Sequence, residues 1–451
     1  MNRIHILIFI SVFATNLSFS QTALTGTFSS DTIISNSLSP YLISSTIIIN
    51  NGATFTVESG TIIYFDNGMS IAVDNATLNI NGNVTDSVYL LNNGTQWGRI
   101  SGQYANINIA YCVFEYANQM ISANYGEIRM NNSSCSNVTG GDAVALHYSD
   151  SVFINDCNFA GIKNTGKIDC IDADAINYGL IFNNIFTNWN DDAIDIGTSA
   201  SNLIIHHNYA ENCDYGVSVG ENSDALLYRN IMVDGHGGIE SHTGAIVTAY
   251  NNTIFNNDYG FSCNHGAVAN SGGTIYLRNT IISQSVYANY SIQPSSNLTI
   301  SYSCSDTDTL PGIGNVFGYP QFVDSLNNDF HLTLGSNCID TGDPNDPLDT
   351  NGNYIDIGVY EFYDTTTVIS QPNRSNFIKL YPNPSSESFM IEGNQINKIV
   401  IFDIEGKQVF SRNYNTEQNR IEINVNRFNQ GLYLVRVNTF EGITEKKLII
   451  K

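Results

Sequence analysis

Six aspartates in the middle of the chain form the one concentrated group of side chains that could do chemistry. Clustered carboxylates supply the oxygen ligands that Ca²⁺ prefers. Two facing carboxyl groups can also act as the acid and the base of glycoside hydrolysis. On an ordinary solvated surface the same residues have neither role. Their arrangement in space therefore decides whether they form a site. The six are Asp169, Asp172, Asp174, Asp191, Asp192 and Asp195.

These aspartates belong to a repeat of 22 to 24 residues. From Ile168 the chain reads I-D-C-I-D-A-D, then D-D-A-I-D-I-G, D-Y-G-V-S-V-G, G-G-I-E-S and D-Y-G-F-S-C. The 3.6-residue periodicity of a helical repeat is absent, and a propeller blade is about twice as long. The period therefore predicts a β-solenoid in which each repeat forms one coil, and positions one period apart lie above one another.

The repeat sorts these residues into two neighbouring columns. An apolar column, which should point inward, contains Ile171, Ile194, Val217, Ile239 and Phe261. The next residue of each strand should point outward, which gives the column Asp172, Asp195, Ser218, Glu240 and Ser262. We expect Asp172 over Asp195, and Asp169 over Asp192, at the strand spacing of about 4.8 Å. Such like charges are unfavourable unless a cation or a proton intervenes.

Other columns have structural interpretations. An asparagine ladder is predicted from Asn184, Asn208, Asn230, Asn252 and Asn279, since each amide can bond to the next. Cys112, Cys135 and Cys157 are 23 and 22 residues apart, which predicts one unbonded stack. Cys304 and Cys338 are the better candidates for a disulfide.

With its Asn-rich coils, the segment from about 40 to 305 resembles the right-handed parallel β-helix family, which includes pectate lyases and polygalacturonases. The fold class we predict is all-β: a right-handed parallel β-helix over residues 21–362, followed by a small C-terminal β-sandwich. Within the first part, residues 319–362 resemble the closing segment of secreted bacterial β-helix proteins and should cap the open end of the solenoid. Residues 363–376 are polar and are typical of a linker.

Both ends of the chain indicate export. Arg3, the apolar run after it and Ser18-Phe19-Ser20 predict a signal peptide over residues 1–20. Residues 377–451 contain Y-P-N-P from Tyr381, a turn at Asp403–Gly406 and G-L-Y-L-V. They resemble the C-terminal sorting domain of the type IX secretion system of Bacteroidetes-type bacteria. This resemblance implies that the type IX machinery is a partner, and a secreted or outer-membrane-attached location.

Two enzymatic readings follow from the β-helix resemblance. Related lyases use an acidic Ca²⁺ site, for which the ligands would be Asp172, Asp174, Asp192 and Asp195. The base would be Lys167, with His236 behind it, although nearby carboxylates raise the pKa of a lysine.

The second reading is a polygalacturonase-like hydrolase, in which Asp169 and the pair Asp191-Asp192 would act. This match fails further on. Tyr215 stands at the histidine position, and no R-I-K follows.

A second cation site is predicted at a turn near the end of the β-helix. Its ligands would be Asp349, Asn351, Asn353 and Asp356, which place oxygens around a glycine turn. An Asx-rich turn without a metal explains the same residues.

The composition restricts the partners. The chain has 42 acidic and 18 basic residues, with a net charge of −24, so it repels nucleic acid. No segment after the leader is long and apolar enough to span a membrane.

We expect the protein to engage an extracellular polysaccharide with Ca²⁺ at the Asp169–Asp195 face, where Asp172, Asp195, Tyr215, Ser218 and Glu240 would contact the glycan. A polysaccharide lyase, a hydrolase and a non-enzymatic adhesin or structural surface protein are the alternatives.

Overall fold

The computed structural model describes residues 21–163, 166–266, 271–363, 378–402, 408–425, 427–439 and 442–451. They form two compact units that divide between Phe362 and Tyr363. The predicted signal peptide, the predicted linker beyond Tyr363 and the turn at Asp403–Gly406 lie outside the described residues. Within them the only helical elements are η1 (Asn36–Leu38) and η2 (Ser325–Asn327), and no helix has the length and apolarity needed to cross a membrane.

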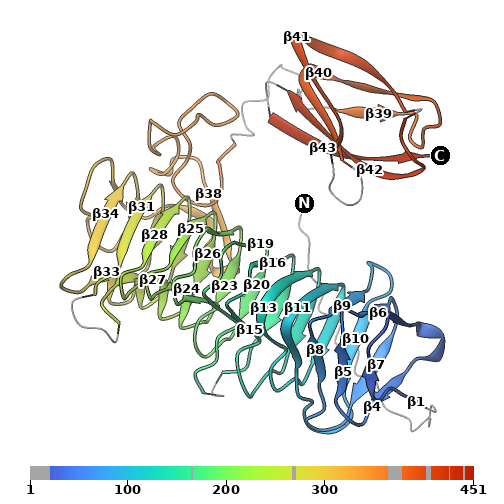
Figure 1. The fold of residues 1–451 in the computed structure, drawn as a ribbon. Coiled ribbons are helices and arrows are strands. Elements are labelled where there is room, and N and C mark those ends of the chain that lie inside the picture. Colours follow the sequence, from blue (N-terminus) through green and yellow to red (C-terminus); the bar gives the residue numbers. More distant parts are fainter. Residues whose placement is uncertain are drawn as a thin grey trace. The chain divides into compact units, whose positions relative to one another are not determined.

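The first unit is a parallel β-helix, as predicted. Each coil contributes one strand to each of three parallel sheets, called face 1, face 2 and face 3 in chain order, and Figure 1 shows these coils stacked from the blue β1 to the yellow β34. Two long strands, β11 (Ile100–Ala110) and β13 (Ile121–Asn131), run from face 2 into face 3.

Face 1 consists of β1 (Thr22–Ala23), β4 (Tyr41–Ile43), β7 (Ile62–Phe65), β10 (Val88–Asn92), β12 (Cys112–Glu115), β14 (Ser134–Ser136), β17 (Asn158–Ala160), β20 (Ile185–Thr187), β23 (Tyr209–Glu211), β26 (Ile231–Val233), β29 (Thr253–Phe255), β32 (Ile281–Ser283), β35 (Cys304–Ser305) and β36 (Val316–Phe317). Face 2 adds to β11 and β13 the strands β2 (Thr27–Phe28), β5 (Ile47–Asn50), β8 (Ile71–Asp74), β15 (Val144–His147), β18 (Ile171–Asp174), β21 (Ile194–Gly197), β24 (Tyr215–Val219), β27 (Gly237–Ser241), β30 (Tyr259–Cys263) and β33 (Ala288–Ile292). Face 3 adds β3 (Thr32–Ile34), β6 (Thr54–Glu58), β9 (Thr77–Asn81), β16 (Ser151–Asn155), β19 (Gly179–Phe182), β22 (Leu203–His206), β25 (Asp224–Tyr228), β28 (Ile246–Tyr250), β31 (Thr274–Arg278) and β34 (Asn297–Ser301).

The interior of the β-helix is filled by apolar columns. The predicted inward column on face 2, from Ile171 to Phe261, is at most 1% exposed at every position. The cysteine prediction is half right. Cys112, Cys135 and Cys157 are buried and free, but Cys135 pairs with Phe114 and Phe159 across face 1. It therefore lies in a different column from Cys112 and Cys157.

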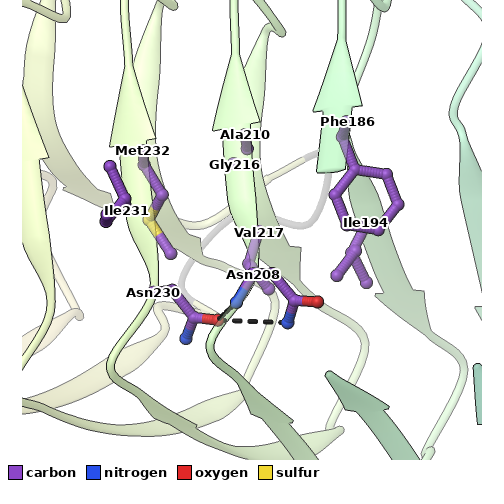
Figure 2. Close-up of a pocket in the computed structure, with 9 residues that line it drawn as sticks. All are labelled: Phe186, Ile194, Asn208, Ala210, Gly216, Val217, Asn230, Ile231 and Met232. Atoms are coloured by element: carbon purple, nitrogen blue, oxygen red, sulfur yellow. Dashed lines mark hydrogen bonds between the residues drawn. The ribbon is translucent and has the colours of Figure 1, made fainter. Parts of the chain in front are cut away.

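The asparagine ladder is confirmed over four coils at the start of face 1. The side-chain oxygens of Asn208, Asn230 and Asn252 each accept the side-chain and backbone N–H groups of the asparagine on the preceding coil, at 2.9–3.1 Å. Figure 2 shows one rung, Asn208–Asn230, beside an interior hollow of ≈ 10 Å³, room for about one water. Asn279 is not a rung, because Thr280 takes that position and bonds to Asn252. Asn279 instead bonds to the closing segment.

The closing segment was predicted to cap the open end of the solenoid. Instead it covers the outside of face 1 in the last coils. There the outward residues of β26 and β32, such as Ile231, Val233 and Ile281, are apolar and need cover. The segment buries them under Phe322 of β37 (Phe322–Asp324) and Phe330 of β38 (Asp329–Leu332).

The predicted disulfide between β35 and the closing segment is absent. Cys304 and Cys338 are both free and buried. Their thiols are in contact, and a hydrogen bond with Cys304, together with burial, raises the pKa of Cys338. Both cysteines belong to the apolar cluster that packs the closing segment against the last coils.

A small β-sandwich was predicted for the second unit, which is all-β as expected and consists of antiparallel strands. Its strands are β39 (Lys379–Tyr381), β40 (Ser388–Phe402), β41 (Gln408–Asn424), β42 (Gly431–Thr439) and β43 (Gly442–Ile450), and they form one curved, nearly barrel-shaped sheet. Asn383, from the Y-P-N-P motif, fixes the chain entry to the last strand. Its amide donates to Lys447 O (2.7 Å) and accepts from Ile449 N (2.9 Å).

The ladder yields a stability prediction. Asn208→Ala removes the acceptor for the Asn184 N–H and the donor to Ile181 O. Each buried group left unpaired costs about 1–3 kcal/mol, so we expect a clearly lower apparent melting temperature by circular dichroism. Asn177→Ala, at an exposed position on a neighbouring coil, is the matched control. Equal melting temperatures for the two variants would contradict the idea that the asparagine ladder stabilises the fold.

Candidate functional site

The outward column of face 2 has the predicted register. Asp172 on β18 pairs directly with Asp195 on β21, Asp195 pairs with Ser218 on β24, and Ser218 pairs with Glu240 on β27. Like charges therefore lie on adjacent strands at Asp172 and Asp195. Ser218 lies between two acids and donates a hydrogen bond to Glu240 Oε2 at 3.2 Å. The column thus changes from two carboxylates to a bonded hydroxyl–carboxylate pair.

A hollow of ≈ 230 Å³ opens beside this column, where β18 and β21 end. Its polar lining consists of five acidic side chains and one imidazole: Asp169, Asp172, Asp174, Asp195, Glu221 and His242. None of the described lysines or arginines lines it. We call this site the acidic hollow. Glu221 and His242 were not predicted from the sequence.

Two stacked glycines shape the acidic hollow. Gly197 and Gly220 lie on consecutive coils between Asp174 and His242. A Cβ atom at Gly197 would lie 2.5 Å from Asp174 Oδ1, and one at Gly220 would lie 2.2 Å from His242 Cε1. Because only glycine permits these approaches, Asp174 and His242 can lie over the glycines, and they close the hollow on two sides.

Three carboxyl groups of the acidic hollow, those of Asp169, Asp172 and Asp195, have raised pKa values and so hold their protons more tightly than usual. Burial, followed by repulsion from Asp195, raises the pKa of Asp169 to about 8. Burial and then Asp174 raise the pKa of Asp172 to about 8 and that of Asp195 to about 7. Near neutral pH these groups therefore share protons or require a cation.

Asp169 and Asp192 also have a structural role. Asp142 Oδ1 accepts the Asp169 N–H, Asp169 Oδ1 accepts the Asp192 N–H, and Asp192 Oδ1 accepts the Tyr215 N–H, at 2.7–3.0 Å. One oxygen of each carboxylate is thus bonded to the next coil. Asp192 is 7% exposed, and burial and then Asp169 raise its pKa well above the usual range. The column is a backbone-bonding ladder as well as a candidate site.

In the part of the chain that the structure describes, two sets of three side chains have ligand atoms within 4.8 Å of one another: Asp169, Asp191 and Asp192, and His147, Asp172 and Asp174. The predicted metal ligands are therefore divided, with Asp192 in one set and Asp172 and Asp174 in the other. His147 was missed because it precedes its partner Asp174 by 27 residues rather than 23. Its Nδ1 lies 3.2 Å from Asp174 Oδ2.

The two predicted bases do not line the acidic hollow. Lys167 is 77% exposed and lies 3.2 Å from Asp191 Oδ1 and 3.7 Å from Asp214 Oδ2. The hydrogen bond with Asp191 raises its pKa, the wrong direction for a base. His236 Nδ1 lies 3.0 Å from Asp258 Oδ2. Lys167 and His236 are therefore each paired with an aspartate outside the hollow.

The remaining predicted residues lie elsewhere. Tyr215 is 9% exposed, and burial, then Glu240, raises its pKa.

At the predicted second cation site, Asp349 Oδ1 accepts the N–H groups of Asn351 and Asn353, both at 2.8 Å. Asp356 is buried and accepts the N–H groups of Asp340 and Phe362. These are the bonds of an Asx-rich turn, and neither acid belongs to the two ligand sets above.

Each of the two units matches a known protein-family model. Residues 142–307 match the family model for a right handed beta helix region, and residues 379–451 match that for a secretion system C-terminal sorting domain. No curated protein matches the chain.

Two solved structures are similar at low identity. A crystal structure of pectate lyase Pel9A is 17% identical, with 74% of this chain and 87% of that chain covered and a TM-score of 0.36. An alginate lyase from Paenibacillus sp. str. FPU-7 is 14% identical, with coverage of 53% and 91% and a TM-score of 0.23. Scores this low carry no functional argument. The sorting domain implies export, either into the medium or to the cell surface. The chain is thus a right-handed parallel β-helix protein that ends in a type IX secretion C-terminal sorting domain.

Proposed function

We propose that this exported protein binds an extracellular polysaccharide at the acidic hollow, with Ca²⁺ held by the carboxylates there. The observation that carries the proposal is the lining itself: five acidic side chains surround ≈ 230 Å³ without a lysine or arginine. Three of them, Asp169, Asp172 and Asp195, have raised pKa values. Burial and then repulsion between neighbouring carboxylates raise these values, and the positive charge of a bound cation would oppose both effects by favouring the ionised form.

The donor set fits Ca²⁺, which takes six to eight oxygen ligands. Asp172, Asp174 and Asp195 would hold the ion, with Asp169 and Glu221 at the edge. Asp192 is a poorer ligand than we expected, because it is buried and bonded to the Tyr215 N–H. Bound Ca²⁺ would supply a positive charge that coordinates the hydroxyl or carboxylate oxygens of a sugar.

Calcium binding should depend on pH, because protons compete for the same oxygens. The pKa values of about 8 and about 7 predict that calorimetric Ca²⁺ affinity falls as the pH drops from 9 to 6. The loss should be roughly tenfold per pH unit for each proton displaced. The double variant Asp172→Asn/Asp195→Asn should lose binding, whereas Asp150→Asn, an exposed acid outside the hollow, should keep it. Equal affinity at pH 6 and pH 9 would argue against this site.

The same groups predict how stability depends on pH without Ca²⁺. Their folded pKa values lie above the unfolded value of about 3.9, so the folded state binds more protons. Their contribution to stability is therefore full below pH 4 and is lost as the pH rises through about 7 to 8. We expect the melting temperature to fall between pH 6 and pH 9 in chelator and to recover when Ca²⁺ is added at pH 9. In Asp172→Asn the fall should be smaller.

Cleavage of the polysaccharide by β-elimination is a second candidate, favoured by one observation. The imidazole of His242 lines the acidic hollow and could remove a proton there, a role that neither Lys167 nor His236 is placed to take. Elimination predicts growth of unsaturated-uronide absorbance on polygalacturonate or alginate. Chelation and His242→Ala should abolish the signal, and His236→Ala should retain it. If neither glycan gives the product, binding alone remains the function.

A further inference from the structure

Three exposed tyrosines form a stack at the corner between face 2 and face 3. The rings of Tyr104 and Tyr125 are 4.9 Å apart at 12°, and those of Tyr125 and Tyr148 are 5.5 Å apart at 18°. The residues are 60%, 40% and 54% exposed. We call them the tyrosine stack. They were not singled out from the sequence, although they are 21 and 23 residues apart.

The corner itself does not require an aromatic side chain. Tyr104, Tyr125 and Tyr148 have φ of 49°, 54° and 54°, in the left-handed region that bulky residues rarely adopt. The neighbouring coils turn the same corner with small or polar residues in the same conformation, namely Asn75 (φ 46°), Ala175 (φ 52°), Thr198 (φ 54°) and Glu221 (φ 54°). The turn geometry is therefore satisfied without tyrosine, and the exposed rings need another explanation.

The stack ends next to the acidic hollow. Tyr148 follows His147, which pairs with Asp174, so Ala175 occupies the corner on the next coil. Among the described residues no other ring packs on Tyr148. On the next coil, about 4.8 Å further along the axis, the corner position that follows Tyr148 carries only the methyl group of Ala175. We call this corner position, between Tyr148 and Ala175 and beside Asp174, the open rung.

We propose that the open rung is a subsite for one pyranose ring of the polysaccharide. A sugar ring has an apolar C–H face that can pack on an aromatic face, and a rim of hydroxyl groups. A pyranose packed on Tyr148 lies roughly in the plane of the coil, because the tyrosine rings stack along the axis. Its hydroxyls then reach Asp174 and the acidic hollow, where carboxylates accept their hydrogens.

The hydroxylated rim of a sugar favours this occupant over other flat ligands, because the carboxylates of the hollow can accept its hydrogens. A nucleic-acid base could stack equally well, but it lacks this rim. The net charge of −24 and the five acids of the hollow repel nucleic-acid phosphates, and they repel the carboxylates of a uronate chain as well, so binding of such a chain should require the Ca²⁺ proposed above. This inference rests on the proposed function, since it adds a neighbouring subsite for the same glycan.

Binding of polygalacturonate and of alginate, measured with Ca²⁺ by affinity electrophoresis and calorimetry, tests the subsite. Tyr148→Ala removes the packing face and should weaken binding roughly tenfold, whereas Tyr148→Phe should bind as wild type does. Ala175→Tyr would add a fourth ring and fill the open rung. It should weaken binding to a similar extent, with a melting temperature no lower than that of the wild type. Tyr104→Ala, at the far end of the stack, is the matched control and should bind normally.

The outcomes separate the two proposals. Wild-type affinity in both Tyr148→Ala and Ala175→Tyr, with loss in Asp172→Asn/Asp195→Asn, would overturn the subsite and leave the acidic hollow intact. An equal loss in Tyr104→Ala and Tyr148→Ala would show that the stack acts through stability. If the wild type binds neither glycan, the proposed function fails and the subsite fails with it.

Discussion

In-register stacking of parallel strands, at one strand spacing per coil, is the constraint on which the rest of this β-helix depends. Each side chain meets its equivalent on the next coil about 4.8 Å away, so a residue is acceptable only if it tolerates a copy of itself or a complementary neighbour. Apolar residues meet this condition simply by packing. The inward column from Ile171 to Phe261 is consequently buried throughout.

Polar residues meet the same condition in two different ways. An amide both donates and accepts, so Asn230 Oδ1 accepts the side-chain and backbone N–H groups of Asn208 while Asn230 Nδ2 donates to Asn252 on the next coil. An ionised carboxylate only accepts. Asp169 can bond the Asp192 N–H with one oxygen, but it cannot bond a second carboxylate without a proton. The Asn column is therefore complete in itself, whereas the Asp column depends on a proton or a cation. This difference places the candidate chemistry on the two aspartate coils.

The sequence was a good guide wherever coil length is constant. The 23-residue spacing of Asp172 and Asp195 gave the register that the strands have. It failed where a loop lengthens a coil. Asn279 follows Asn252 by 27 residues, and the ladder position belongs to Thr280. His147 precedes Asp174 by 27 residues. The cysteine spacing of 23 and 22 suggested one column, but Cys135 aligns with Phe114. Sequence spacing gives only the number of residues in a coil. The strand register also depends on which of these residues form the corners, and the spacing does not show that.

The acidic hollow and the open rung arise from one change in the corner residues. On the three coils from Tyr104 to Tyr148 this corner carries large rings, and on the next three, from Ala175 to Glu221, small or polar residues replace them. In the adjacent column Gly197 and Gly220 carry no side chain. The backbone is the same on both sides of this change, since the left-handed corner at Ala175 matches that at Tyr148. Side-chain volume alone therefore creates the recess. It exposes one aromatic face on one side and, on the other, carboxylates whose shared hollow is lined by neither lysine nor arginine among the described residues, which is a combination that suits a ligand with one apolar face and a hydroxylated rim.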